Sequence, residues 1–132
     1  FTGWRPYEHR VLAQVGDKRL PMPINIDTVN GFFGLSLRTG EEMEAFLSTR
    51  RVPIEKIRSA EDLVLSSVGP ELYAAFFRDY TTKQWGMEPA RLPRSVTARV
   101  PTRASHDDRY FTDTYQIMPD RGYTAMFEAM LD

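Results

Sequence analysis

The sequence has 132 residues, of which 42% are hydrophobic and 27% are charged, and its 17 lysines and arginines nearly balance 18 aspartates and glutamates. This composition is typical of one folded domain with a sizeable core, and the formal net charge of −1 argues against nucleic acid or an anionic membrane surface as a partner. The absence of cysteine excludes disulfides and thiolate metal sites, and the longest apolar run, Leu72–Phe77, is too short to span a bilayer, so we expect a cytoplasmic protein.

Two short apolar runs near the N-terminus predict a β-hairpin. They cover residues 10–15 and 20–24, and the turn residues Gly16–Arg19 separate them. Pro21 and Pro23 cannot donate hydrogen bonds to a neighbouring strand, which places the second strand at a sheet edge. We expect this hairpin to lean on a sheet that lies outside the chain.

Residues 26–86 carry the start and stop signals of four helices. Polar caps, a proline in a first helical turn and closing glycines are the signals used. Four helices joined by short links predict a small helical bundle. The signals are Asp27 and Gly34 for the first helix, Thr39–Glu42 for the start of the second, Ser59 and Gly69 for the third, and Pro70 and Gly86 for the fourth.

After the fourth helix the apolar periodicity stops. Pro89, Pro93 and Pro101 punctuate a stretch that predicts a long loop, and long loops inside compact domains are often functional. Helical spacing resumes over residues 122–132. The predicted fold class is therefore α+β, mainly α: a β-hairpin followed by a small helical bundle, a long mobile loop and a final helix.

The fourth helix carries a candidate binding face. Phe77, Thr81 and Trp85 are spaced four apart and share one side, with Tyr80 beside them. Aromatic rings can stack on a nucleobase, and a hydroxyl can hydrogen-bond to the edge of the base. Alternatively, Phe76, Phe77 and Tyr80 fill the bundle core, as apolar stripes usually do. The spacing leaves both interpretations open.

Five arginines follow this helix within nineteen residues. The planar guanidinium matches the geometry of phosphate, so a loop that carries arginines can close over a diphosphate. The alternative is a solvated loop whose arginines pair with Glu88, Asp107 and Asp108. Together with the aromatic face, the arginines favour a nucleotide-like anion as ligand. They are Arg91, Arg94, Arg99, Arg103 and Arg109.

Other chemistry has little support in the sequence. His9 and His106, the only histidines, are far apart and lack neighbouring ligands, so we expect no metal site. The serines lack the elbow motif of a nucleophile, and the chain contains neither a Gly-rich phosphate loop nor a dinucleotide-binding fingerprint. Asp107 and Asp108 suggest an acid–base pair only weakly. The residues by themselves indicate binding rather than a reaction.

Five segments nevertheless resemble the bacterial UDP-galactopyranose mutase family in order and spacing, over essentially the whole chain. The stretch from Phe76 to Trp85, with the arginines after it, is the most specific of them. The segments are Trp4–Val11 (WRPYEHRV), Pro23–Asn25 (PIN), Phe76–Trp85 (FFRDYTTKQW), Thr97–Arg103 (TARVPTR) and Asp108–Tyr115 (DRYFTDTY).

The resemblance implies a cytoplasmic, homodimeric isomerase of galactofuranose biosynthesis that supplies the cell wall. It would interconvert UDP-galactopyranose and UDP-galactofuranose on reduced FAD, whose ring nitrogen displaces UDP from the sugar. Residues 1–25 would be a hairpin of the antiparallel sheet domain, and residues 26–118 the helical bundle with a mobile substrate loop at about 90–103. Residues 119–132 would form the return helix into the FAD-binding α/β domain. The main flavin-binding segment would lie outside this chain, which alone should be inactive.

The resemblance also assigns substrate-binding roles to residues of the aromatic face. Phe76 and Phe77 would wall the uracil pocket. Tyr80 would stack on the uracil, and Thr81 would hydrogen-bond to it. Trp85 would border the ribose and the sugar.

Two further residues receive roles from the same resemblance. Arg99 would move with the loop onto the diphosphate, which makes it the catalytic candidate, and Tyr110 would line the nearby wall. The other phosphate-binding groups of the family lie downstream, so UDP should bind weakly to this chain alone.

Two alternative functions stay open at this point. One is a fragment of a different FAD-dependent oxidoreductase, because a hairpin and a return helix are common in flavin folds. The other is a stand-alone helical interaction module that binds no nucleotide. The chain begins at Phe1 rather than methionine and ends within a predicted helix, so we expect a middle fragment of marginal stability when isolated.

Overall fold

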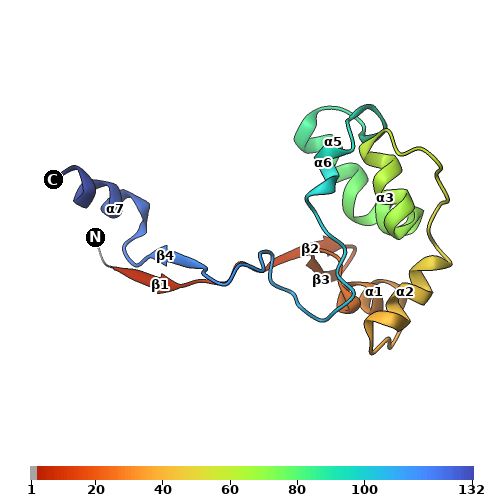
Figure 1. Cartoon of the computed structure of the whole chain (residues 1–132), viewed down its shortest axis with the longest axis horizontal. Coiled ribbons are helices and arrows are strands. Elements are labelled where there is room, and N and C mark those ends of the chain that lie inside the picture. The colour runs from red at the N-terminus through yellow and green to blue at the C-terminus, as the bar shows by residue number, and fades with distance from the viewer. Residues whose placement is uncertain (1–2) are drawn as a thin grey trace.

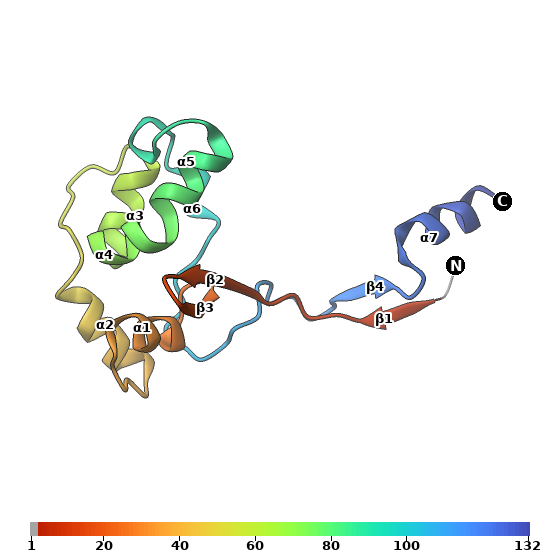
Figure 2. The same ribbon diagram turned by 180° about the vertical axis from the view of Figure 1, so that it is seen from behind.

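The computed structural model describes residues 3–132 and shows an extended molecule with two parts (Figure 1). The body comprises residues 11–110, and the arm comprises β1 (Trp4–Pro6), β4 (Ile117–Pro119) and α7 (Gly122–Leu131). Two extended segments connect the arm to the body, which is also evident from behind (Figure 2). Residues 1 and 2, which we assigned to the hairpin segment 1–25, lie outside the described residues. The α+β fold class is confirmed.

The arm is held together by a strand pair that the sequence did not predict. β1 pairs antiparallel with β4, with Trp4 opposite Pro119. The predicted final helix is present as α7, but none of its residues is buried, and Phe127 and Leu131 are 55% and 87% exposed. Within residues 3–132, no helix combines the length and apolarity needed to cross a membrane.

The predicted hairpin is present in the body. β2 (Val11–Val15) pairs antiparallel with β3 (Lys18–Met22), and Gly16 in the turn has a φ of 61°. Pro21 lies in β3, whose only partner strand within the described chain is β2, as predicted for a strand that contains proline. The hairpin lies between two groups of helices, with α1 against β3 and the fourth predicted helix against β2 (Figures 1 and 2).

Helix α1 (Ile26–Phe33) ends at Gly34 as predicted, but its cap differs from the prediction. The cap is Asn25, which has extended backbone angles and accepts a hydrogen bond from the Thr28 N–H, while Thr28 Oγ1 accepts one from the Asn25 N–H. Asp27 is instead the second residue of the helix. The prediction was wrong because Asn25 follows a proline-rich strand end whose extended backbone is the conformation that a cap requires.

Helices α2 (Gly40–Ser48) and α3 (Ala60–Val68) begin where they were predicted. Ser59 caps α3 with a complete capping box. In α2 the box is only half formed: Thr39 accepts from the Glu42 N–H, but the Glu42 carboxylate accepts from the backbone N–H of Arg38.

The fourth predicted helix contains an unpredicted π-helical turn. It comprises α4 (Pro70–Tyr73), the π-helix η1 (Ala74–Arg78) and α5 (Asp79–Trp85), and it ends at Gly86 with a φ of 69°. A π-helical turn inserts one residue into the hydrogen-bond ladder, and such turns are frequent at functional sites. One buried cluster unites this helix with the hairpin and the other helices. Its members are Leu20, Ile24, Ile26, Val29, Met43, Leu47, Val64, Val68, Leu72, Tyr73, Phe76 and Phe77.

The region predicted as a long loop is partly helical. It contains the 3-10 turn η2 (Pro89–Arg91) and the short helix α6 (Ser95–Ala98), which packs on α3. Thr97 is 5% exposed, and its hydroxyl donates to the carbonyl of Ala60. Proline obscured the first of these turns, because Pro89 occupies the first position of η2, where proline is compatible with a helical turn.

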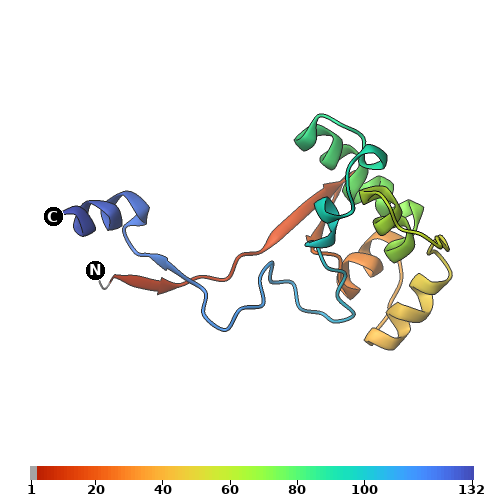
Figure 3. The same cartoon turned by 45° about the horizontal axis from the view of Figure 1, so that its top comes forward.

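After α6 the chain runs back past the hairpin towards the arm (Figure 3). We call residues 103–110 the return segment. Its backbone is tied to the start of α1, since the Ser105 carbonyl accepts from the Ile26 N–H and the Asp107 carbonyl accepts from the Asn25 amide. These bonds join residues about eighty positions apart.

Candidate functional site

A cavity of about 670 Å³, which we call the main cavity because it is the larger of the two described below, lies between the hairpin and the helix Pro70–Trp85. The chain from α6 onwards and the end of the return segment complete its wall. All seven residues selected from the sequence line it, although they come from three separate stretches of chain. They are Phe76, Phe77, Tyr80, Thr81, Trp85, Arg99 and Tyr110.

The aromatic residues divide between the core and the cavity surface. Phe76 and Phe77 are 6% and 8% exposed and belong to the buried cluster while also reaching the cavity. Tyr80 and Trp85 are 67% and 46% exposed, and neither is in the core. The core interpretation therefore holds for the two phenylalanines and is wrong for Tyr80.

Thr81 combines burial with a free hydroxyl. The residue is 5% exposed, yet its side chain makes no hydrogen bond within the described chain. By contrast, the neighbouring Thr82 hydroxyl donates to the carbonyl of Arg78 at 2.7 Å. The Thr81 hydroxyl can therefore donate to or accept from a ligand in the main cavity.

The five arginines have different environments. Arg109 binds the Asp107 carboxylate through two nitrogens, and Arg103 donates to backbone carbonyls. The other three, Arg91, Arg94 and Arg99, are exposed and form no ion pair with any residue that the structure describes. Among them only Arg99 lines the main cavity.

The carboxylates of the return segment are engaged by arginines. Arg109 holds the pKa of Asp107 well below its ordinary value through side-chain hydrogen bonds and a backbone hydrogen bond. Asp108 instead pairs with Arg10 at 3.0 Å. Asp107 is therefore ionised at neutral pH and cannot serve as a general acid. The proposed pairing of loop arginines with nearby carboxylates holds only for Arg109.

The sequence analysis did not predict the wall of the main cavity that faces the helix Pro70–Trp85. Four consecutive residues of β2, Val11 to Gln14, line the cavity together with Met22 of β3. No signal in the sequence placed this strand against a helix about sixty residues later. Gln84 also lines the cavity, and its position four after Tyr80 on the same helix is a signal that was available.

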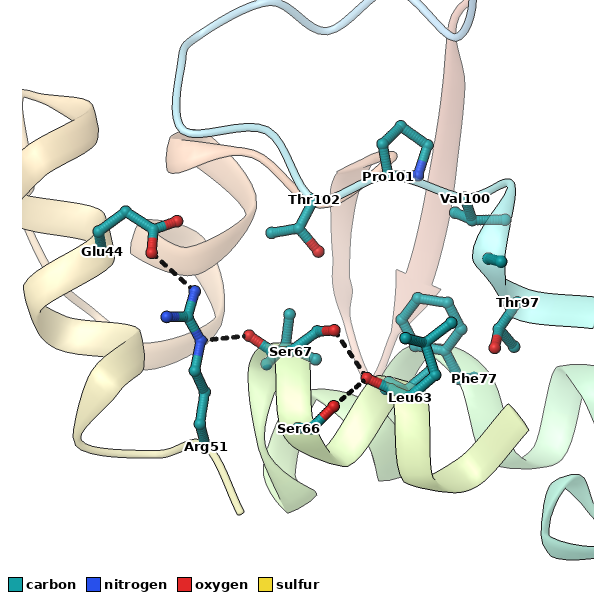
Figure 4. Close-up of a pocket in the computed structure, with 13 residues that line it drawn as sticks. Glu44, Arg51, Leu63, Ser66, Ser67, Phe77, Thr97, Val100, Pro101 and Thr102 are labelled. Atoms are coloured by element: carbon teal, nitrogen blue, oxygen red, sulfur yellow. Dashed lines mark hydrogen bonds and ion pairs between the residues drawn. The ribbon is translucent and has the colours of Figure 1, made fainter. Parts of the chain in front are cut away.

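A second cavity, of about 420 Å³, is lined chiefly by residues of α3 and of the chain from Thr97 to Thr102 (Figure 4). It shares Phe77, Thr97 and Val100 with the main cavity. Arg51 at its edge donates to the Glu44 carboxylate and to the Ser67 carbonyl, so its charge is compensated. The residues around Val100 therefore separate two cavities.

The fold and the main cavity define an α+β protein whose cavity presents aromatic rings, a free hydroxyl and an unpaired guanidinium. Such a surface suits a ligand with a planar ring and negative charge. Comparison with known proteins finds such a family: the sequence model of UDP-galactopyranose mutase matches residues 75–132.

Similarity to curated proteins extends over the whole chain. A probable UDP-galactopyranose mutase of Klebsiella pneumoniae is 42% identical over all 132 residues, and a dTDP-fucopyranose mutase of Escherichia coli is 36% identical over the same length. A UDP-galactopyranose mutase of Mycoplasma pneumoniae is 30% identical over 96% of the chain. The chain is therefore similar to UDP-galactopyranose mutases over its whole length, in agreement with its sequence motifs, and it spans about a third of the length of these relatives.

Proposed function

We propose that this chain forms the nucleotide-binding part of a UDP-galactopyranose mutase, an isomerase that interconverts UDP-galactopyranose and UDP-galactofuranose. The observation that carries the proposal is the convergence of seven residues, selected from sequence motifs, on one cavity of about 670 Å³. Pockets of roughly 300–1,000 Å³ accommodate small-molecule ligands, so the volume suits a nucleotide.

In this proposal the helix Pro70–Trp85 recognises the uridine. The exposed ring of Tyr80 stacks on the uracil, and the Thr81 hydroxyl hydrogen-bonds to its edge. Phe76 and Phe77 form the floor of the pocket, where their burial in the core keeps them in place. Trp85 borders the ribose and the sugar.

Arg99 binds the diphosphate and is the catalytic candidate. Its guanidinium has no partner in the described chain, so binding phosphate breaks no existing ion pair. The residues around it separate the main and the second cavity, which leaves room for the loop at about 90–103 to shift. Tyr110 lines the neighbouring wall. Neutralising the leaving diphosphate is the contribution that this chain makes to the reaction.

The cofactor in this proposal is reduced FAD, but the residues of this chain do not fit it. Both sheets of the described chain are antiparallel pairs of strands, whereas dinucleotide-binding units are built on parallel strands followed by a Gly-rich turn. Among the described residues, Arg99 is the only cation that lines the main cavity, so the cavity has no further positive charge to bind a second diphosphate. The flavin is therefore assigned to residues outside this chain.

The arm fits a role as the connection to the rest of the enzyme. Residues 1–25 are assigned to the antiparallel sheet domain, residues 26–118 to the helical domain with its substrate loop, and residues 119–132 to the FAD-binding domain. The exposed apolar residues of α7, among them Phe127 and Leu131, are then covered by that domain. We further propose a cytoplasmic homodimer.

A dTDP-sugar is a second candidate substrate, because the relative at 36% identity is named a dTDP-fucopyranose mutase. Thymine carries a methyl group that uracil lacks, and the deoxyribose lacks the 2′-hydroxyl. An aromatic stacking surface accepts both bases. Discrimination must therefore come from other residues that line the cavity, such as Val11 and Met22 in the wall opposite the helix.

The test is a mutase assay on the full-length enzyme with chemically reduced FAD. Conversion of UDP-galactofuranose to the pyranose form is followed by chromatography, and each of UDP and dTDP is tested as a competitor. Arg99→Ala should reduce turnover and UDP affinity, whereas Arg91→Ala, an exposed arginine outside the cavity, is the matched control and should change neither. Unchanged turnover and affinity in Arg99→Ala refute the assignment of the diphosphate site.

A further inference from the structure

Arg103, one of the arginines selected as a candidate anion binder, is engaged inside the protein. Its guanidinium donates to the carbonyls of Arg109 and Tyr110, the latter at 2.9 Å. Its backbone N–H donates to the Ile24 carbonyl at 2.8 Å. The Arg103 side chain therefore joins the two ends of the return segment, since this segment begins at Arg103 and ends at Tyr110.

Hydrogen bonds hold the backbone of Tyr110 through both its N–H and its carbonyl. Its N–H donates to the His9 carbonyl at 2.6 Å, while its own carbonyl accepts from Arg103. The Tyr110 ring lies edge-on against the His9 ring, with centroids 5.6 Å apart, and against Phe111, with centroids 4.9 Å apart. Tyr110 and Phe111 both line the main cavity, so their placement sets the shape of that wall.

The same arginine also anchors the stretch that carries Arg99. Arg103 is four residues beyond Arg99, and its backbone is fixed to Ile24 at the end of the hairpin. Arg99 and Tyr110 line the same cavity from the two sides of this anchor. The Arg103 side chain therefore ties the wall at Tyr110 to a backbone position four residues from Arg99, although this side chain does not itself line the main cavity.

We infer that Arg103 is a positioning residue that couples the placement of Arg99 to that of Tyr110, and thereby sets the affinity of the main cavity for a nucleoside diphosphate. This inference rests on the proposed function of the cavity. Arginine suits the role because its planar fork donates to two carbonyls at once, which the single ammonium of lysine does less well. Arg109 does not substitute for it, because Asp107 occupies the Arg109 guanidinium.

The test compares Arg103→Lys with Arg109→Lys in the full-length enzyme. Both changes keep the charge and lie in the same segment, but only Arg103 donates to the Tyr110 carbonyl. Calorimetric titration with UDP should give a dissociation constant about tenfold higher for Arg103→Lys, as expected when a hydrogen bond of roughly average strength is lost, and little change for Arg109→Lys. Hydrogen exchange at the Tyr110 amide should accelerate only in Arg103→Lys.

A double variant separates positioning from general loosening. In a Tyr110→Ala background, adding Arg103→Lys should weaken UDP binding much less than it does in the wild type, because the positioned group is gone. Wild-type affinity in Arg103→Lys, equal losses in both backgrounds, or equal losses for Arg109→Lys refute the inference. If the wild-type enzyme does not bind UDP, the proposed function fails, and the exchange of the Tyr110 amide still decides whether Arg103 positions this residue.

Discussion

Replacing Tyr80 by alanine should weaken nucleotide binding without weakening the fold. Tyr80 is 67% exposed and lies outside the buried cluster, so its removal should change the free energy of unfolding by no more than about 0.5 kcal/mol. A stacked base contributes roughly 1–3 kcal/mol, so the dissociation constant for UDP should rise by about 5-fold to 150-fold.

Phe76→Ala on the same helix is the matched control. Phe76 is 6% exposed and its ring centroid lies 5.9 Å from that of Phe32, so truncation should cost about 3–5 kcal/mol of stability. Urea unfolding and calorimetric titration measure the two quantities separately. Inorganic pyrophosphate, which lacks the base, should bind Tyr80→Ala as it binds the wild type. Unchanged UDP affinity in Tyr80→Ala, or a stability loss comparable to that of Phe76→Ala, refutes the stacking role.

Three further predictions concern stability. Gly69→Ala should cost at least about 1–3 kcal/mol in urea unfolding, because φ is 88° and a Cβ would lie 2.4 Å from the Arg50 carbonyl oxygen. Asn25→Ala removes the cap of α1 and a tie to the return segment and should cost about 1–3 kcal/mol by the same assay. The pKa of His106 is raised from 6.5 in the folded protein, chiefly by the hydrogen bond to Asp27. The contribution of this bond to stability is therefore complete below pH 6.5 and is lost as pH rises through the higher pKa of the folded state. The melting temperature of the wild type should fall more between pH 6 and 8 than that of His106→Gln, and parallel curves contradict this assignment.

Local signals predicted much of the body. Ser59, Pro70 and Gly86 marked helix ends correctly, because caps and left-handed glycines depend on a few neighbouring residues. The spacing of Phe77, Thr81 and Trp85 predicted their common surface for the same reason. Residues within one helix need no knowledge of the rest of the fold.

Long-range features were not predictable from such patterns. The pairing of Trp4 with Pro119 joins short strands from opposite ends of the chain, and neither strand has enough residues to show alternation. Asn25 was overlooked as a cap because its role depends on an extended backbone and on a carbonyl from the return segment. The guanidinium partners of Arg103 and Arg109 likewise depend on where the chain returns, so composition alone could not separate them from Arg99.

The strand pair of the arm brings the outgoing and returning chain together at one place, with Arg5 opposite Met118. The segment between these strands therefore begins and ends at neighbouring positions. This geometry allows one domain to be inserted into another. The body and its two connecting segments can therefore be exchanged as one unit: transplanting residues 7–116 between relatives that use different nucleotides requires only two adjacent junctions. Base preference should travel with the graft, while the recipient keeps its own remaining chemistry.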